Sequence, residues 1–271
     1  MNYQDRFGGV ARLYGVDESS IYQSAHACIV GVGGVGSWAA EALARSGVGK
    51  ITLIDMDDIC VTNVNRQVHT LTSTVGQLKV DVMAERIRGI NPDCEVITVM
   101  NFVDQKNVAE LITQEMDCVV DAIDSLKSKA ALVNHCKRHK IPVICTGAAG
   151  GQTDPTKIEI ADLNKTYNDP LIRRVRSWLR RNYGYSRNPK RVYSIPVVYS
   201  TEQLVYPQPD GSVCQQKAME DGSTKLDCNS GFGAVTMVTA SFGFVAATKA
   251  LELMSKHIKK KRAKLDQSGT L

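Results

Sequence analysis

Short apolar runs alternate with segments of helical periodicity along the first 150 residues of the chain. The apolar runs are typical of buried strands, and they occupy residues 27–32, 51–54, 94–100, 118–123 and 142–146. Segments with apolar residues at helical spacing separate them, at 37–45, 76–90, 108–112 and 126–139. This regular alternation predicts an α/β fold, with a Rossmann-like, doubly wound and mostly parallel sheet that carries helices on both faces.

The pattern changes after residue 151. KIEIADL at 157–163 predicts an edge or antiparallel strand, a basic helix follows it, and 192–199 is a further strand candidate. The stretch 208–227 is rich in turn residues and predicts a loop. The segment 231–254 is apolar and carries no charge before Lys249. Such a segment lies at the lower edge of what crosses a bilayer, and its many small residues favour a tightly packed core helix instead.

These patterns divide the chain into four parts. We expect an N-terminal helical arm at 1–26 and a nucleotide-binding Rossmann domain at 27–160. We expect residues 161–255 to form an extension packed on the same domain, with the basic helix, a strand and the apolar helix. Residues 256–271 are rich in lysine and poor in apolar residues, so we expect a basic, disordered tail.

A glycine-rich motif stands between the first predicted strand and the first predicted helix. It contains four glycines, Gly31, Gly33, Gly34 and Gly36. They allow the backbone to turn tightly and to approach a phosphate, and the helix that follows offers free N–H groups and a positive dipole end. Asp55 ends the second predicted strand, where a carboxylate accepts hydrogen bonds from a ribose. Strand, glycines, helix, strand and acid in this order predict a nucleotide site.

Further polar residues follow the strands that form the same edge of the predicted sheet. Asn63, Arg66 and Gln67 follow the second strand closely, Lys79 lies in the first turn of a helix, and Asp124 follows the fourth strand. Cations neutralise the charge of a triphosphate, and a carboxylate near phosphates suits Mg²⁺. A nicotinamide cofactor needs neither. These residues therefore favour ATP with Mg²⁺ over NAD.

Four motifs resemble the E1-like family in their order and spacing. They are GVGGVGSW, LIDMDDICVTNVNRQ, GQLKVDVMAERIRGINP and VVDAIDS. That family includes the activating enzymes of the sulfur carriers ThiS and MoaD, which adenylate a carboxylate with ATP and Mg²⁺. The resemblance implies that Asp55 holds the ribose and that Asp124 ligates Mg²⁺. It assigns contacts with the phosphates to Asn63, Arg66 and Lys79. It also places three further residues in the nucleotide site: Asp57, Gln67 and Ser125.

The chain departs from that family at two points. Its eight cysteines include no CxxC pair, so we expect no zinc site of the kind that many of these activating enzymes carry. The family also begins with RYxRQ, whose second arginine reaches into the ATP site of the partner subunit. Here RFGGVARLYG has Gly9 at that position, and Arg12 or Arg6 stands as the substitute.

Both departures are shared with one branch of the family. Five segments closely resemble the tRNA threonylcarbamoyladenosine dehydratases, along nearly the full length. They are RFGGVARLYG, VTNVNRQVH, DAIDSLKSKAALV, STEQLVYPQPDGSVC and NSGFGAVTMVTASFGFVA. The resemblance implies that ATP activates the threonyl carboxylate of the nucleotide t6A at position 37 of tRNA. The carbamoyl nitrogen then closes a ring to give cyclic t6A. It also implies a homodimer and a link to a cysteine desulfurase with its sulfur-acceptor protein.

The basic residues of the chain gather in one region. The formal net charge is +5, yet residues 165–193 alone hold nine Lys and Arg against one acid. Such a cluster predicts a surface for RNA phosphates, and the interleaved Trp178, Tyr183 and Tyr185 are candidates for stacking on bases. The predicted tRNA contacts are Arg173, Arg174, Arg176, Arg180, Arg181, Arg187, Lys190 and Arg191. A solvated basic helix with Trp178 on its buried face is the alternative interpretation.

Three other functions remain open from the residues. The chain resembles enzymes that adenylate the C-terminal glycine of a ThiS- or MoaD-type carrier protein, although such a partner favours an apolar groove over a basic helix. The glycine motif and Asp55 by themselves also permit an NAD-dependent oxidoreductase. A scaffold that binds nucleotide without turnover is the third. MNYQDRFGG contains no apolar stretch, so we expect a reduced, cytoplasmic protein that does not associate with a membrane.

Overall fold

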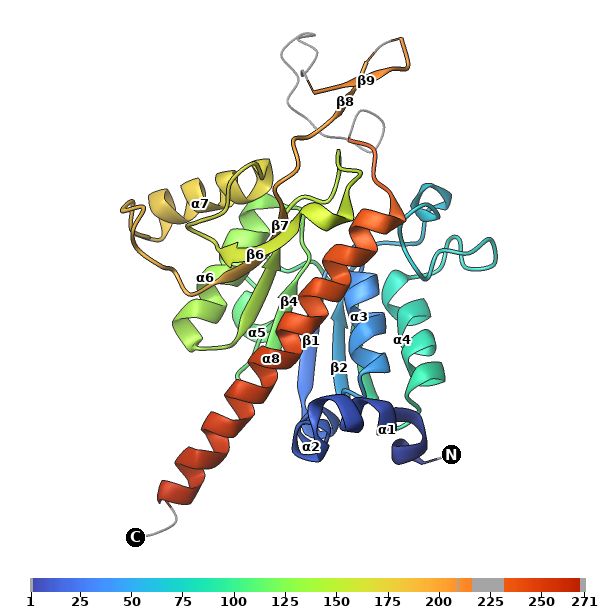
Figure 1. Ribbon diagram of the computed structural model, residues 1–271, viewed down its shortest axis with the longest axis vertical. Coiled ribbons are helices and arrows are strands. Elements are labelled where there is room, and N and C mark those ends of the chain that lie inside the picture. The colour runs from blue at the N-terminus through green and yellow to red at the C-terminus, as the bar shows by residue number, and fades with distance from the viewer. Residues whose placement is uncertain (1, 209, 216–231, 269–271) are drawn as a thin grey trace.

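The computed structural model describes residues 2–208, 210–215 and 232–268 (Figure 1). Within these residues seven strands form one sheet, in the order β3-β2-β1-β4-β5-β7-β6. Their bounds are β1 (His26–Val30), β2 (Lys50–Ile54), β3 (Glu95–Val99), β4 (Cys118–Asp121), β5 (Val143–Thr146), β6 (Ile158–Asp162) and β7 (Pro196–Ser200). All neighbours pair in parallel except β6, which runs antiparallel to β7 at the edge. The predicted fold class is confirmed, including the antiparallel strand.

Helices connect the strands and enclose the sheet. They are α1 (Tyr3–Tyr14), α2 (Val16–Ser24), α3 (Gly36–Arg45), α4 (Lys79–Ile90), α5 (Val108–Leu111), α6 (Leu126–His139), α7 (Pro170–Asn182) and α8 (Thr236–Ser268). Two short 3-10 turns, η1 (Val61–Asn63) and η2 (Pro155–Lys157), lie in loops. The predicted loop at 208–227 falls partly outside the described residues. Strand β8 (Tyr206–Pro207) lies just before this stretch and β9 (Val213–Cys214) lies within it. The two strands pair to form a small hairpin.

The two faces of the sheet bury two separate apolar clusters because side chains alternate along each strand. In β1, Ala27 and Ile29 belong to the cluster that packs against α3, α4 and α8. Cys28 and Val30, one position along, belong to the cluster beneath α5, α6 and α7. The sheet is therefore covered on both faces, as the strand–helix alternation predicts.

Helix α8 crosses the α3 face of the sheet diagonally (Figure 1). It approaches α3 so closely that a Cβ on Gly243 would lie 2.7 Å from the Cβ of Trp38. The part Thr236–Asp266 is long and apolar enough to cross a membrane, but 56% of its most apolar window is buried inside the protein. The interpretation of this segment as a core helix is thus confirmed.

The prediction that residues 256–271 are disordered is wrong for the part that the structure describes. Helix α8 continues to Ser268, because Ile258 remains in its buried stripe and two lysines reach the body of the protein. Lys261 Nζ lies 2.9 Å from Asp117 Oδ1, and Lys259 pairs with Glu18 of α2. Lysine, arginine and alanine are also good helix formers. Composition indicated a solvated tail, and tertiary contacts extended the helix instead.

The N-terminal arm consists of α1 and α2, of which α1 was not among the predicted elements. The Tyr3 hydroxyl of α1 donates a hydrogen bond of 2.8 Å to the carbonyl of Gly47, in the loop between α3 and β2. Gly47 has a φ of +81°, and a Cβ there would lie 2.4 Å from the Tyr3 hydroxyl oxygen. The arm is therefore packed at the N-terminal ends of the strands, below the sheet in Figure 1.

Candidate functional site

The order of the strands defines one crevice at the carboxyl edge of the sheet. Chain connections run outward from β1 toward β3 on one side and from β4 toward β5 on the other. The loops that follow β1 and β4 therefore diverge, and ligands of open α/β sheets bind between loops that diverge in this way. All the residues predicted for the nucleotide site follow β1, β2 or β4, or begin α3, α4 or α6. The topology brings them to the same edge.

The glycine turn after β1 is built so tightly that side chains are excluded from it. Gly31 has a φ of +88°, and a Cβ there would lie 2.8 Å from the carbonyl oxygen of Ala122. A Cβ on Gly36 would lie only 1.8 Å from the carbonyl oxygen of Gly31. Helix α3 begins at Gly36 with no side-chain cap and no acid in its first turn. Its positive dipole end is thus available to an anion such as a phosphate.

Asp55 links the end of β2 to this turn. Its Oδ2 accepts a hydrogen bond of 2.6 Å from the backbone N–H of Val32, and its Oδ1 accepts one of 2.9 Å from the N–H of Asp57. The side chain is buried. Each carboxylate oxygen has a second lone pair, so Asp55 remains able to accept hydrogen bonds from ribose hydroxyls. Its position is fixed before any ligand arrives.

Arg66 lies on the loop after η1, with its alkyl stem against the glycine turn. A Cβ on Gly34 would lie 3.3 Å from Arg66 Cγ. The exposed guanidinium donates from Nη1 to the carbonyl of Thr62 at 2.9 Å and to Asn65 Oδ1 at 3.0 Å. A guanidinium has five N–H donors, so most of them are left for a phosphate. Asn63, at the start of the same loop, is buried and accepts a hydrogen bond from the backbone of its own turn.

The Arg66 loop is held by residues that sequence reasoning did not assign to the site. The indole N–H of Trp38 donates to the carbonyl of Arg66 at 3.0 Å. From α8, Thr239 donates to the same carbonyl at 3.3 Å, and Thr236 donates to the carbonyl of Asn65 at 2.6 Å. Helix α8 lies about 170 positions further along the chain, so no local pattern could reveal these contacts. The tryptophan in GVGGVGSW was the available signal.

Lys79 begins α4 and points back to the end of β2. Its Nζ lies 2.7 Å from Asp57 Oδ2, and its backbone N–H donates to the carbonyl of Asp57 at 3.1 Å. The side chain is buried, whereas half of the Asp57 side chain is exposed. An ammonium with three donors can hold Asp57 and one phosphate oxygen together. Lys79 and Asp57 therefore act as a pair.

Asp124 and Ser125 are exposed in the loop between β4 and α6. A buried ion pair supports this loop from below: Lys129 Nζ lies 2.9 Å from Asp121 Oδ2, and both side chains are completely buried. Burial raises the pKa of Asp121, while the Lys129 ammonium opposes the shift. The Asp121 Oδ1 also accepts a hydrogen bond of 3.1 Å from the N–H of Ile123. Lys129 is a supporting residue that the sequence motifs did not indicate.

Several buried polar atoms around the Arg66 loop lack a hydrogen-bond partner among the described residues. They include Gln67 Oε1, both ring nitrogens of His69, Thr70 Oγ1 and, at the start of α3, Ser37 Oγ. Burial, followed by the charges of Lys79 and Arg86, lowers the pKa of His69 to about 4. The imidazole is thus neutral at physiological pH. Buried polar groups without partners are rare, and they concentrate where ligands or ordered water bind.

The basic region divides into two sets of side chains. Arg176 donates to the carbonyls of Leu163 and Thr166, each at 3.0 Å. Arg180 donates to Asn164 Oδ1 at 2.8 Å and to the hydroxyl of Tyr193 at 3.2 Å. These two arginines brace the loop after β6, so the structure does not place them on an outer surface as the sequence predicted. Of the eight predicted tRNA contacts, the exposed ones are Arg173, Arg174, Arg181, Arg187, Lys190 and Arg191.

The aromatic residues near the basic helix are less available than the sequence indicated. Tyr183 and Tyr185 pack against the apolar cluster beneath α7. Tyr185 also meets Tyr193 edge to face, at 5.0 Å between ring centroids. Trp178 is partly buried and has Lys127 Nζ over its ring, 5.6 Å from the centroid. Of the three stacking candidates, Trp178 alone lines a surface hollow described below.

Arg12 does not approach the crevice of its own subunit. It lies in α1, which packs at the opposite end of the sheet from the glycine turn. In this chain its guanidinium lies close to Gly8 and Gly9 of the same helix. A role for Arg12 in an ATP site therefore requires a second copy of the chain.

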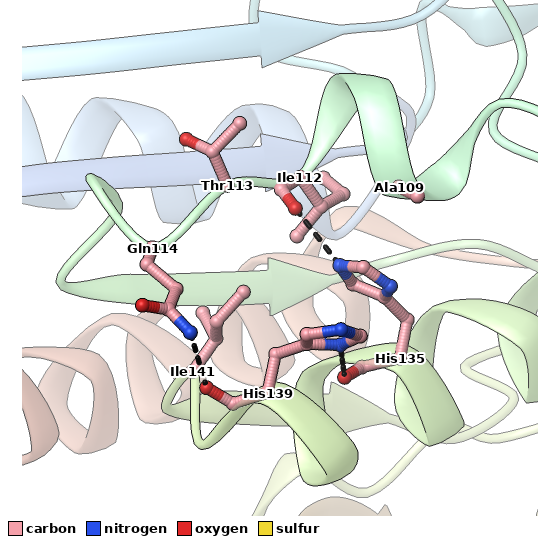
Figure 2. Close-up of a pocket in the computed structure, with 7 residues that line it drawn as sticks. All are labelled: Ala109, Ile112, Thr113, Gln114, His135, His139 and Ile141. Carbon is pink, nitrogen blue, oxygen red and sulfur yellow. Dashed lines mark hydrogen bonds between the residues drawn. The ribbon is translucent and has the colours of Figure 1, made fainter.

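A hollow of about 270 Å³ at the other end of the sheet contains no residue of the predicted site. Figure 2 shows its lining between α5 and α6, with Gln114, His135 and His139. His135 Nε2 donates to the carbonyl of Ile112 at 2.9 Å, and His139 Nδ1 donates to the carbonyl of His135 at 2.9 Å. Among the described residues, no group of three His, Cys, Asp or Glu side chains could hold a metal ion, here or elsewhere. Because its lining shares no residue with the predicted site, the hollow is not part of the crevice.

Comparison with known proteins agrees with this geometry. A model of the ThiF family matches residues 9–269. The chain belongs to the ThiF family. The tRNA threonylcarbamoyladenosine dehydratase of Escherichia coli K12 is 56% identical over 252 residues, which are 93% of this chain and 94% of that protein. The resemblance to this branch of the ThiF family, inferred from the motifs, is confirmed.

Solved structures of this ThiF-family branch have the same fold. Crystal structures of the E. coli tRNA N6-threonylcarbamoyladenosine dehydratase in complex with ATP and with AMP each match with a TM-score of 0.84. Their sequences are 50% and 51% identical, and the matches cover 95% of this chain and 96% of those chains. The shared fold therefore extends over 95% of this chain.

Proposed function

We propose that this protein uses ATP to convert t6A at position 37 of tRNA into cyclic t6A. The observation that carries the proposal is the 56% identity with the E. coli tRNA threonylcarbamoyladenosine dehydratase over 93% of the chain. The related enzyme has been captured with ATP, which an adenylation consumes, and with AMP, which is released when the adenylate reacts on. The crevice supports the same use here, because it joins a ribose acceptor, phosphate donors and an exposed carboxylate.

The reaction has two steps. An oxygen of the threonyl carboxylate attacks the α-phosphorus of ATP, and pyrophosphate leaves. The carbamoyl nitrogen of the same side chain then attacks the activated carbonyl carbon, AMP leaves, and the nitrogen loses its proton. Nucleophile and acyl group are tethered in one nucleotide, so the effective molarity is high and no nucleophile from the protein is needed. The net change to the nucleotide is the loss of one water.

Each site residue has a distinct task in the first step. Asp55 accepts hydrogen bonds from the ribose, and the glycine turn and the start of α3 lie along the phosphates. The proposed phosphate donors are Gly33, Gly34, Gly36, Asn63, Arg66, Gln67 and Lys79. The N–H of Gly31 instead donates to the carbonyl of Ile54 at 2.9 Å, so Gly31 serves the tight turn. Arg66 and Lys79 stabilise the charge that develops as pyrophosphate leaves. Asp57 orients Lys79 through their 2.7 Å ion pair.

The residues at the start of α6 fit Mg²⁺. Magnesium is bound through one or two carboxylates together with phosphate oxygens and water, so a nucleotide site needs no cage of protein ligands. Asp124 offers an exposed carboxylate, and Ser125 offers a hydroxyl beside it. When bound, Mg²⁺ would neutralise phosphate charge. A dedicated zinc site is not part of this proposal.

The tRNA lies against the exposed cations of α7 and the loop that follows, namely Arg173, Arg174, Arg181, Arg187, Lys190 and Arg191. Two of these chains form a homodimer in which Arg12 of one subunit completes the ATP site of the other. A cysteine desulfurase with its sulfur-acceptor protein is the further partner. The protein acts in the cytoplasm.

Adenylation of a carrier protein is the second candidate, because the ThiF family includes enzymes that act on carrier proteins. The basic face of α7 favours RNA over such a partner, since an extended protein tail prefers an apolar groove. An NAD-dependent oxidoreductase is disfavoured by Arg66 and by the Lys79–Asp57 pair, which a dinucleotide does not require. A scaffold that merely binds nucleotide would bind ATP without consuming it.

The test is mass spectrometry of tRNA nucleosides. Incubation of t6A-containing tRNA with the protein and Mg·ATP should remove the mass of one water from t6A, and omission of ATP should prevent the change. Nucleosides must be isolated under mild conditions, because an activated ring reopens in water. Unchanged t6A together with consumption of ATP in the presence of a carrier protein would favour the second candidate.

A further inference from the structure

A surface hollow of about 360 Å³ lies between the start of α6 and the outer face of α7. Its lining consists of Leu126, Arg173, Arg174, Ser177, Trp178 and Arg181. The α7 members recur at helical spacing, so they share one face of that helix. The volume is at the lower end of ordinary ligand sites and suits a single nucleotide. We refer to it as the α6–α7 groove.

The groove concentrates positive charge that the protein itself does not neutralise. Lys127 adds a fourth cation to the three arginines, because its ammonium lies over the Trp178 ring. Within the described part of the chain, the ion pairs and side-chain hydrogen bonds include none of these four cations. Helix α6 also begins without a side-chain cap and without an acid in its first turn. Like charges held this close repel each other unless an anion joins them.

The inward arginines of the same helix give an internal contrast. Arg176 and Arg180 are each satisfied by two or more acceptors of the protein, so their place in the fold is explained by structure alone. Arg173, Arg174 and Arg181 meet no such acceptors in the part of the chain that the structure describes. An exposed guanidinium fork matches the oxygens of a phosphate. The outer set is therefore suited to an external anion.

The groove also adjoins the crevice. Helix α6 begins at Leu126, directly after Asp124 and Ser125, and Leu126 is part of the groove lining. A strand of RNA with one nucleotide in the groove would thus place a neighbouring nucleotide at the carboxyl edge of the sheet. Trp178 adds an aromatic surface to the arginines, which is the usual combination for an unstacked base.

We propose that the α6–α7 groove binds one nucleotide of the anticodon loop adjacent to the adenosine that is modified. Arg173, Arg174 and Arg181 hold its phosphate, and its base lies against the part of the Trp178 ring that the groove exposes. This inference rests on the proposed function and adds a defined subsite to it. The groove acts in binding and positioning, while adenylation takes place in the crevice.

Two triple variants with equal loss of charge test the phosphate contacts. The first is R173Q/R174Q/R181Q in the groove. The second is K137Q/R138Q/K140Q, which removes three exposed cations from the other end of α6. Binding of t6A-containing tRNA is measured as a function of salt concentration. The groove variant should reduce the slope of log K against log salt by about one per lost phosphate contact, and the control variant should keep the wild-type slope.

Trp178 is tested with W178L and W178F. Phenylalanine keeps an aromatic face and leucine does not, while both keep an apolar side chain at the edge of the core. W178L should lower the affinity for tRNA about tenfold to hundredfold, and W178F should retain most of it. Equal melting temperatures and equal ATP binding for all variants verify that the fold and the crevice are intact.

The outcomes separate this inference from the proposed function. Equal slopes for the two triple variants, or equal tRNA affinity for W178L and the wild type, would overturn the groove while conversion of t6A by the wild type still stands. A wild-type protein that binds tRNA but leaves t6A unchanged would overturn the proposed function. In that case a reduced salt slope for the groove variant would still support an RNA subsite.

Discussion

The two walls of the crevice are built in opposite ways. On the β1–β2 wall, the glycine turn, Asp55 and the Arg66 loop are already tied together by hydrogen bonds to backbone groups. On the β4–α7 wall, Asp124 and the outer arginines of α7 are exposed to solvent. One wall is rigid before any ligand binds, and the other presents unpaired charge.

This difference fits ligands of different size. A small nucleotide gains most from groups that are fixed in advance, because no reorganisation is needed when charge develops in the reaction. A large polyanion gains affinity mainly through displaced counterions, and exposed cations suffice for that purpose. The β1–β2 wall is therefore suited to ATP, and the β4–α7 wall to Mg²⁺ and RNA.

The largest expected effect comes from Asp124. Asp124→Ala should reduce turnover by about 10³-fold or more, because the proposed Mg²⁺ ligand is lost and the phosphate charge is left without its metal. Binding of tRNA should remain nearly at the wild-type level, since we propose that the exposed cations of α7 bind the RNA. Turnover is followed by release of AMP, and binding by filter retention. Glu110→Ala on α5 is the control, and retained turnover in Asp124→Ala would remove Asp124 as the metal ligand.

Arg66 tests the rigid wall. Arg66→Ala should lower kcat/KM, because one donor to the developing charge is lost. The corresponding rise in activation free energy should be about 2–4 kcal/mol. Trp38→Phe keeps an aromatic ring but removes the N–H that holds the Arg66 carbonyl, so its cost should be near the ~1 kcal/mol of one hydrogen bond. Steady-state kinetics with varied ATP measure both. Equal effects of the two changes would show that Arg66 acts through the loop and not on phosphate.

His69 makes the stability of the rigid wall depend on pH. Its pKa is lowered by burial from 6.5 to about 4 in the folded protein, so the unfolded chain binds the proton more readily. The free energy of unfolding is thus highest above pH 6.5 and falls as the pH drops toward 4, by about 3 kcal/mol for this residue. His69→Gln should flatten that part of the curve in denaturant titrations. Burial also lowers the pKa of His26, His135 and His257, so a smaller dependence on pH should remain.

The inward arginines provide the smallest change and sharpen the contrast within α7. Arg176→Gln should destabilise the fold by about 1–3 kcal/mol, because buried carbonyls lose a charged donor. The salt dependence of tRNA binding should be the same as in the wild type. Thermal unfolding and the salt titration measure the two effects. A reduced salt slope without loss of stability would place Arg176 on the RNA surface after all.

Much of the fold could be predicted because its signals are local. The alternation of strands and helices up to residue 146 follows from periodicity within windows of a few residues. Helix α6 was predicted with the bounds that the structure has. The tail was the main error, since lysine-rich composition indicates solvation and carries no information about partners such as Asp117 or Glu18.

The candidate site shows the same division. The sequence by itself determined the glycine turn, Asp55, and the set of polar residues that follow parallel strands, because strand direction alone brings those positions to one edge. It could not separate Arg173 from Arg176, since the two side chains are chemically identical and lie three positions apart on one helix. Only the tertiary structure decided between them. Arg176 meets carbonyls of Leu163 and Thr166, and Arg173 meets solvent, because the loop after β6 folds against one face of α7 and leaves the other open.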